Sequence, residues 1–179
     1  MRTALLSFLA AAALFTGWAA ETPRPAPPFT IMRTNLPPLA LNQYKGKVVA
    51  LAFIYTTCPH CQRLTGVLNQ VAKDYAAQGV QVLECAFNDD AVATLPGFIG
   101  RFNPQFPIGY SNRPTVLSYL QYPPDDSRLL YVPHLLFIDR AGTIRGDYPG
   151  EGPFFKDPDG NIRKELDQML KTSPATASR

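Results

Sequence analysis

Short apolar runs alternate with amphipathic segments along the chain, and this alternation predicts its secondary structure. The run 48–55 is rich in β-branched and aromatic residues and has no alternating polar positions, which is typical of a strand buried on both faces of a sheet. The apolar runs 80–87 and 135–138 predict two further strands. A turn at 139–142 then reverses the chain into a strand over 143–147, so the last two strands form a hairpin.

Between these runs, apolar residues recur at helical spacing. The apolar positions of the first expected helix are Leu64, Val67, Leu68, Val71, Ala72 and Tyr75. A second helix is expected over 91–102, where Pro96 should kink or split it, and a short helix begins near Pro114. A further helix precedes the C-terminal tail, and short strands are expected at 29–31 and 39–41. The order of the main elements describes an α/β domain.

The first 19 residues predict an export signal. Arg2 supplies a positive charge, an apolar run follows over 4–15, and small residues stand at Gly17 and Ala19, which is the layout of a cleaved secretory signal peptide. We expect cleavage after Ala19. The alternative is a retained membrane anchor, which needs about 20 apolar residues and so more than this run supplies. The protein is therefore expected in the periplasm or another extracytoplasmic space, where disulfides persist.

The rest of the chain is expected to form one domain. Residues 20–28 are rich in proline and predict an extended linker, residues 29–171 predict the domain, and residues 172–179 predict a disordered tail. The full chain has 179 residues and a formal net charge of +3. Its Lys and Arg residues form no basic run, so nucleic-acid binding is not expected. We expect a monomer.

Two cysteines, Cys58 and Cys61, form a C-x-x-C motif between the first buried strand and the first helix. At a helix N-terminus, the helix dipole and the free N–H groups stabilise a thiolate on Cys58. The missing N–H of Pro59 costs little in a first helical turn, and a protonated His60 would add positive charge. We therefore expect Cys58 to have a lowered pKa and to be the attacking or attacked sulfur. Cys61 would then resolve the mixed disulfide.

The motif has two other interpretations. A C-x-x-C pair can be half of a zinc site, but the further candidate ligands, Cys85 and His134, are not paired in the sequence. Cys85 is expected to be a buried free thiol and His134 a structural residue. A purely structural disulfide would close almost no loop and so would stabilise little. Redox chemistry is therefore favoured, and no metal or bound cofactor is expected.

The segments 44–49, 58–61 and 132–142 give the chain a resemblance to the thioredoxin-like superfamily. It is similar to exported members of the thiol-reductase and thiol-specific-antioxidant branch. The resemblance implies a thioredoxin-like fold, with a central mixed sheet flanked by helices and an N-terminal strand extension. It also implies that the Val132–Pro133 bond is cis and faces the cysteine pair, and that the Val132 backbone pairs with an extended substrate. An ordinary trans proline before a strand is the alternative.

Several positions depart from the pattern of the family. Thr57 stands where the family usually has tryptophan before the first cysteine. Ala52 stands where thioredoxins carry a buried aspartate, and the stretch 62–65 lacks the acidic residue of cytochrome-maturation reductases. Glu84 in the neighbouring strand could replace these acids as a proton acceptor. An outward-facing side chain is, however, the favoured interpretation of Glu84.

The resemblance leaves the direction of electron flow open. The middle residues of the motif, Pro59 and His60, resemble those of periplasmic disulfide-introducing oxidases, in which a cationic histidine makes the disulfide more oxidising. The scaffold instead resembles a reductase. Peroxidases of this superfamily carry a proline and a threonine at the positions that Leu51 and Tyr55 occupy here, so peroxidase activity is not expected.

Together these features predict an exported thiol–disulfide oxidoreductase that acts on protein thiols or disulfides and has a membrane redox partner. The residues predicted to act in catalysis are Cys58, Cys61, Pro59, His60 and Pro133, and those predicted to contact the substrate are Thr57 and Val132. The rival prediction is a thioredoxin-like binding, metal-delivery or chaperone module without turnover, which would present its aromatic-rich stretch over 102–122 to a partner.

Overall fold

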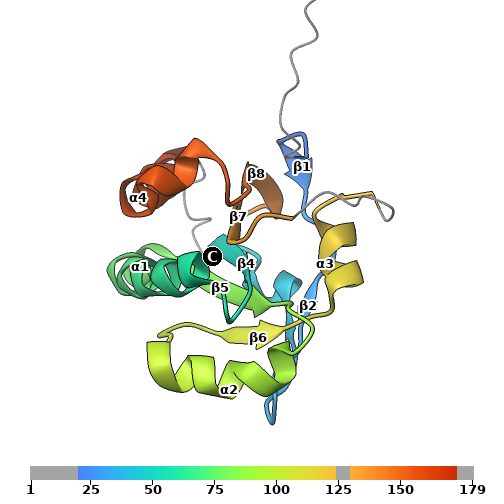
Figure 1. Ribbon diagram of the computed structural model, residues 1–179. Coiled ribbons are helices and arrows are strands. Elements are labelled where there is room, and N and C mark those ends of the chain that lie inside the picture. Colours follow the sequence, from blue (N-terminus) through green and yellow to red (C-terminus); the bar gives the residue numbers. More distant parts are fainter. Residues whose placement is uncertain (1–19, 124–129, 173–179) are drawn as a thin grey trace, which may run out of the picture.

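The computed structural model describes residues 20–123 and 130–172 (Figure 1). The expected signal peptide at 1–19 and positions 173–179 of the expected tail lie outside the described residues. Thr172, the first residue of that expected tail, is the last residue of a helix. Within the described ranges, no helix combines the length and the apolar character that a membrane span requires.

Six strands of the described chain form one mixed sheet in the order β1-β8-β7-β4-β5-β6. Their bounds are β1 Arg24–Pro25, β4 Val48–Ile54, β5 Val80–Ala86, β6 Ile108–Tyr110, β7 His134–Ile138 and β8 Thr143–Tyr148. Strand β4 runs parallel to β5 and antiparallel to β7, and all of its residues are buried. This central position explains its uninterrupted apolar run. Two short strands, β2 (Thr30–Ile31) and β3 (Leu39–Ala40), pair separately.

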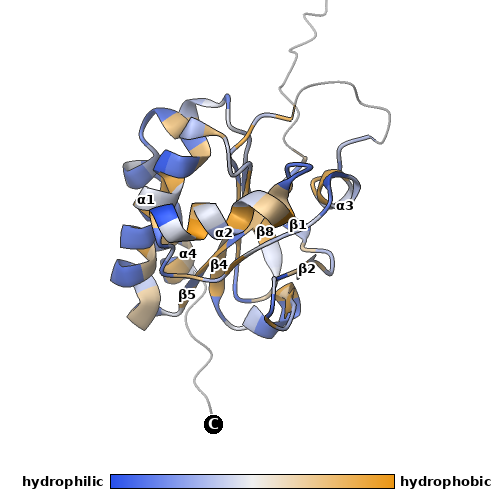
Figure 2. Ribbon diagram, turned by 60° about the horizontal axis from the view of Figure 1, so that its bottom comes forward, coloured by the Kyte–Doolittle hydropathy of each residue, from blue (hydrophilic) through white to orange (hydrophobic). Residues whose placement is uncertain are grey.

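Helices cover both faces of the sheet (Figure 1). Their bounds are α1 Pro59–Tyr75, α2 Ala91–Phe102, α3 Arg113–Tyr119 and α4 Pro158–Thr172, with short 3-10 turns η1 Leu41–Tyr44, η2 Ala76–Gln78 and η3 Pro153–Lys156. Helices α1, α2 and α4 enclose one apolar core, and α3 encloses the other together with β2 and β3. In Figure 2 the central strands β4 and β5 are largely apolar and α1 shows a polar outer side. The predicted α/β architecture, with a mixed sheet between helices, is confirmed.

Helix α2 runs without interruption through Pro96, although the sequence predicted a kink or a split there. A proline removes the hydrogen bond to the carbonyl four residues earlier, which here belongs to Val92. Pro96 is exposed and Val92 is 52% exposed. The freed carbonyl therefore lies on the solvent side of the helix, where water can satisfy it.

The sequence pattern did not predict strand β6. It has only three residues and lies in a stretch rich in proline and aromatic residues, too short to show the alternation of a strand. It pairs in parallel with β5, where Ile108 stands opposite Glu84. Strand β5 therefore lies inside the sheet, between β4 and β6, and its side chains pack into both apolar cores.

The N-terminal segment does not form a free linker over all of 20–28. Strand β1 pairs antiparallel with the start of β8 at one edge of the sheet. At the other edge, Met32 and Tyr110 of β6 exchange two backbone hydrogen bonds of 2.8 Å. Between these contacts, Phe29 and Ile31 are buried in the core beneath α3. The segment therefore crosses one face of the sheet from edge to edge.

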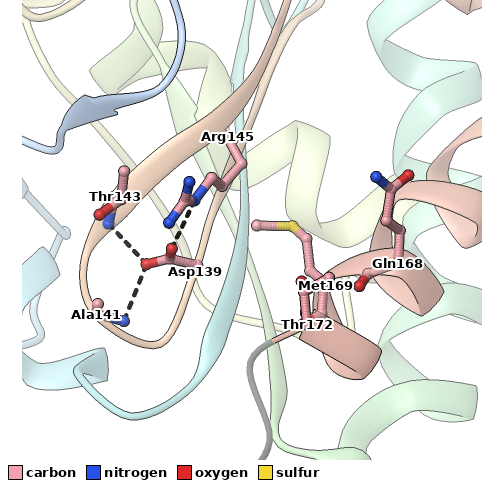
Figure 3. Close-up of polar contacts among 7 residues, drawn as sticks. All are labelled: Asp139, Ala141, Thr143, Arg145, Gln168, Met169 and Thr172. Atoms are coloured by element: carbon pink, nitrogen blue, oxygen red, sulfur yellow. Dashed lines mark hydrogen bonds and ion pairs between the residues drawn. The ribbon is translucent and has the colours of Figure 1, made fainter.

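Asp139 closes the predicted hairpin between β7 and β8 (Figure 3). Its Oδ1 accepts hydrogen bonds of 2.9 Å from the backbone N–H groups of Ala141 and Thr143, and its Oδ2 accepts one of 2.8 Å from Arg145. Burial alone would raise the pKa of Asp139, but these bonds favour the ionised carboxylate and lower the pKa below its ordinary value. The turn predicted at 139–142 is thereby confirmed.

Candidate active site

The cysteine pair lies where β4 gives way to α1. Cys58 immediately precedes the first helical residue, Pro59, and its carbonyl accepts a hydrogen bond of 3.0 Å from the N–H of Gln62. The Cys58 side chain is half-buried, whereas that of Cys61 is fully buried. The first-turn N–H groups and the dipole of a 17-residue helix therefore act on the more accessible of the two sulfurs.

The environment of Cys61 disfavours its thiolate. Burial is the main cause that raises the pKa of Cys61, and a backbone hydrogen bond at Tyr55 offsets only part of that effect. The sulfur of Cys58 and the carboxylate of Glu84 raise the pKa of Cys61 further, because each can carry a negative charge nearby. Cys61 is therefore a thiol that needs a proton acceptor before it can attack.

The loop before β7 lies against Cys58. The Val132–Pro133 bond is cis, as the family resemblance implied, and the Val132 carbonyl oxygen is 3.8 Å from the Cys58 Sγ, which can donate to it. Gly150 packs onto this loop from the chain after β8. A Cβ at Gly150 would lie 2.8 Å from the Val132 carbonyl carbon and 2.9 Å from the Pro133 oxygen. Only glycine permits this approach, because both neighbouring atoms belong to the backbone.

Exposed residues surround Cys58, and they include Thr57, Pro59 and His60. The Nη2 of Arg63 lies 3.0 Å from the Nδ1 of His60. Guanidinium groups only donate hydrogen bonds, so Nδ1 of His60 acts as the acceptor in this pair. A histidine whose Nδ1 accepts is neutral, so in this arrangement Arg63 and not His60 supplies the positive charge beside the motif. The sequence analysis did not predict this role of Arg63, although the i,i+3 spacing of His60 and Arg63 places both residues on one side of the helix.

Glu84 is buried beside the cysteine pair, so the expectation that its side chain faces outward is wrong. On β5 it stands level with Ala52 of β4, and none of its surface is exposed. Burial raises the pKa of Glu84 to about 8, against the opposing effect of a 2.9 Å hydrogen bond from Thr65. Its Oε2 has no hydrogen-bond partner among the described residues. The chain therefore holds a buried acid beside Ala52, supplied by the neighbouring strand.

Thr65 connects Glu84 to Cys61. The Thr65 Oγ1 lies 2.9 Å from the Glu84 Oε1 and 3.1 Å from the Cys61 carbonyl oxygen. A hydroxyl has one proton and can donate it to only one of these oxygens at a time. A protonated Glu84 can donate to Thr65, which frees the Thr65 proton for the Cys61 carbonyl. An ionised Glu84 can only accept, so proton transfer at Glu84 changes the hydrogen bonds next to Cys61.

The burial of Glu84 follows from the face of the sheet on which it lies. Side chains two positions apart on a strand share a face, so Glu84 lies on the same face as Val82 and Ala86, which belong to the core that α1 helps to enclose. Its partner Thr65 lies on α1, 19 positions away, and no pattern within the strand reveals that contact.

Two other residues singled out in the sequence lie inside the protein. Cys85 is fully buried, as expected, and burial raises its pKa. His134 is also buried, and its Nε2 lies 2.6 Å from the Oδ1 of Asp147. Throughout the described ranges, no group of three or more His, Cys, Asp or Glu side chains gathers closely enough to hold a metal ion.

A C-x-x-C pair at the start of a helix, after the central strand of a mixed sheet and against a cis-proline loop, defines the thioredoxin-like thiol–disulfide oxidoreductases. The chain belongs to the Redoxin family, whose pattern matches residues 21–171. The family resemblance predicted from the sequence is therefore confirmed.

Curated relatives and solved structures agree with this assignment. The chain is 28% identical over 153 residues to the thiol-disulfide oxidoreductase ResA of Geobacillus kaustophilus, covering 81% of this chain and 83% of that protein. It is 22% identical over 151 residues to ResA of Bacillus thuringiensis, covering 84% and 78%. The fold matches a thiol:disulfide interchange protein of Chlorobium tepidum with a TM-score of 0.65 at 23% identity, covering 83% of this chain and 99% of that one.

Proposed function

We propose that the chain is an exported thiol–disulfide oxidoreductase that exchanges a disulfide with protein thiols or disulfides. The observation that carries this proposal is the unequal exposure of the two sulfurs: Cys58 is accessible beside the Val132 carbonyl, and Cys61 is fully buried. This division suits one sulfur that meets the substrate and one that resolves the mixed disulfide. Family membership and the names of the curated relatives support the same activity.

The exchange proceeds in two displacements. The Cys58 thiolate attacks one sulfur of a substrate disulfide, a Cys58–substrate disulfide forms, and the other substrate sulfur leaves as a thiolate. Cys61 then loses its proton and attacks the Cys58 Sγ, which forms the Cys58–Cys61 disulfide and releases the second substrate thiolate. Two electrons pass from the pair to the substrate, and the same steps in reverse oxidise a substrate dithiol.

Glu84 is the proton acceptor for the second displacement. Its pKa of about 8 lets both protonation states exist near neutral pH, which suits a group that must take up and return a proton. The free Oε2 supplies the accepting oxygen. Uptake of the proton also removes the negative charge that raises the pKa of Cys61, so the transfer favours the attacking thiolate.

The remaining predicted residues complete the surface around Cys58. Thr57, Pro59 and His60 are exposed beside it, and we assign Thr57 to substrate contact and the other two to the tuning of the Cys58 thiolate. The Val132 backbone offers hydrogen-bonding groups to an extended substrate segment, and Pro133 shapes the loop that presents them.

We also propose export, with removal of residues 1–19 after Ala19, and action as a monomer with a membrane redox partner. The charged, apolar and small-residue regions of the N-terminus support the signal. A pair that turns over must be returned to its starting state by a redox partner, and a partner in the membrane can carry the electrons between compartments. The extracytoplasmic space supplies disulfides as substrates.

Substitution of the cysteines tests the proposal. Cys58→Ser should abolish both the reduction of insulin disulfides and the oxidation of a small dithiol. Cys61→Ser should instead accumulate a mixed disulfide with the substrate, visible by mass spectrometry, because the first displacement survives and the second does not. Cys85→Ser is the matched control and should retain turnover, because Cys85 is buried outside the pair. Full turnover by Cys58→Ser would refute the proposal, and a wild-type protein that binds a partner without turnover would favour the binding-module alternative.

Equilibration of the pair in glutathione buffers, followed by alkylation of free thiols, determines the direction of electron flow. A potential near about −120 mV identifies a disulfide donor, in which the Pro59–His60 pair sets the function. A potential near about −270 mV identifies a reductant that depends on an electron supply.

A further inference from the structure

A buried charged network lies behind the loop that contacts Cys58. Asp147 of β8 holds two partners, one on each carboxylate oxygen. Its Oδ2 accepts a 2.7 Å hydrogen bond from Arg24 of β1, and its Oδ1 lies 2.6 Å from the Nε2 of His134, the first residue of β7. The exposed fractions of the three side chains are 9% for Arg24 and 1% each for Asp147 and His134. An ionised carboxylate only accepts, so both partners donate to Asp147.

This network is costly for a purely structural feature. Among the described residues, three buried polar atoms in this region have no hydrogen-bond partner: Arg24 Nε, His134 Nδ1 and the Tyr119 hydroxyl. Apolar side chains of similar size in place of a buried ion pair often preserve or increase stability. The retention of an incompletely satisfied polar network in the core therefore needs a reason other than stability.

The network is attached to the loop through His134. His134 directly follows Pro133, and its ring meets the Tyr122 ring edge-to-face with the centroids 6.3 Å apart. The other end of that short loop, at Val132, contacts the Cys58 Sγ. Only the buried Pro133 separates His134 from Val132, so a displacement of the His134 backbone also displaces the Val132 backbone. The three strands involved lie side by side (Figure 1).

We propose that Arg24, Asp147 and His134 are positioning residues that hold the Val132 backbone in register with Cys58 for an extended protein substrate. The N-terminal segment would then take part in substrate recognition, since Arg24 belongs to β1. The inference rests on the proposed thiol–disulfide exchange. It distinguishes substrates by class: a polypeptide that pairs with the Val132 backbone depends on the network, and a small disulfide that meets only the Cys58 sulfur does not.

The test compares two substrates in the full chain. Arg24→Gln removes the charge but keeps a polar side chain. It should lower kcat/KM for insulin by about tenfold, because a loop displaced by a fraction of an ångström loses backbone pairing. This decrease in kcat/KM should come mainly from a higher KM, with kcat little changed. The rate with glutathione disulfide should stay within about twofold of wild type, because the Cys58 sulfur is unchanged.

Arg145→Gln is the control. It removes one positive charge from β8, the neighbour of β1, and it breaks the ion pair with Asp139 in the turn that precedes β8. It should leave the ratio of the two kcat/KM values unchanged. If Arg24→Gln does not fold, judged by circular dichroism, the double variant Arg24→Gln/Asp147→Asn takes its place. That variant removes both charges and leaves no unpaired ion in the core.

Three results separate the possibilities. A selective loss with insulin supports the network as a positioning device. Equal rates for the variant and the wild type on both substrates would overturn the positioning role. An equal loss on both substrates would also overturn it, because a merely structural role lowers both rates in proportion to the folded fraction. A wild-type protein that exchanges with neither substrate would overturn the proposed function itself.

Discussion

At the scale of single residues, Glu84 shows how a buried acid can serve a redox pair from a neighbouring strand. Ala52 leaves room on β4, and Glu84 stands level with it on β5. Its carboxyl reaches Thr65, which also lies 3.1 Å from the Cys61 carbonyl. The acid therefore lies one hydroxyl away from the backbone of the resolving cysteine. It titrates near neutral pH because burial raises its pKa to about 8.

The raised pKa of Glu84 predicts a pH-dependent stability. The folded protein binds the Glu84 proton more tightly than the unfolded chain does. The stabilisation of the folded state by the protonated Glu84 is therefore complete below the ordinary pKa of 4.5 and is lost as the pH rises through about 8. Between these values the free energy of unfolding should fall with pH by up to about 1.4 kcal/mol per unit. Glu84→Gln should remove this slope, measured by urea unfolding from pH 4 to 9.

A matched change at an exposed acid controls for general charge effects. Glu21 is exposed, so Glu21→Gln should leave the slope unchanged. Glu84→Gln should also slow the second displacement and accumulate the mixed disulfide, because the variant cannot accept a proton from Cys61. A wild-type slope in Glu84→Gln would contradict the raised pKa. A normal rate of resolution would contradict the proton transfer.

At the scale of elements, the close contact between Gly150 and the loop before β7 predicts a sensitive position. Gly150→Ala would place a Cβ 2.8 Å from the Val132 carbonyl carbon, so the loop must shift away from Cys58. We expect the rate of insulin reduction to fall by at least about tenfold, because displacement near the reacting sulfur is costly. The protein should also lose about 1–3 kcal/mol of stability.

Gly97→Ala is the control for this prediction. Gly97 lies on the exposed side of α2, and a Cβ there meets nothing within 4 Å. The variant should gain about 0.5–1 kcal/mol, because alanine loses less conformational entropy in a helix, and should keep full activity. Unchanged insulin reduction in Gly150→Ala would show that the loop can move without consequence.

The elements that the sequence predicted are those with a complete local pattern. The run at 48–54 and the apolar stripe of α1 each carry their periodicity within one segment, so the junction that holds Cys58 could be located. Strand β6 has three residues and no such pattern. The error at Glu84 has a different origin, because its partner Thr65 lies on α1, 19 positions away. The Arg24–Asp147 pair joins residues 123 positions apart, and no local pattern reveals a contact of that range.

At the scale of the whole molecule, the proposed export fixes the starting point of the mature chain. Cleavage after Ala19 removes Arg2 and one positive charge, so the net charge falls from +3 to +2. The intact mass of the exported protein should correspond to a chain that begins at Ala20. Light scattering should give the mass of a single copy. A mass that retains residues 1–19 would indicate a membrane anchor instead.

The N-terminal segment also determines how the sheet meets other proteins. Open edges of a sheet invite a further strand from another chain, and such pairing leads to aggregation. Here one stretch of chain covers part of both edges: β1 pairs with the start of β8, and Met32 pairs with Tyr110 of β6. Pro25 has no N–H to offer an incoming strand. The segment between these two contacts also buries Phe29 and Ile31 in the core, so a deletion within it would pull the chain away from a sheet edge or from the core.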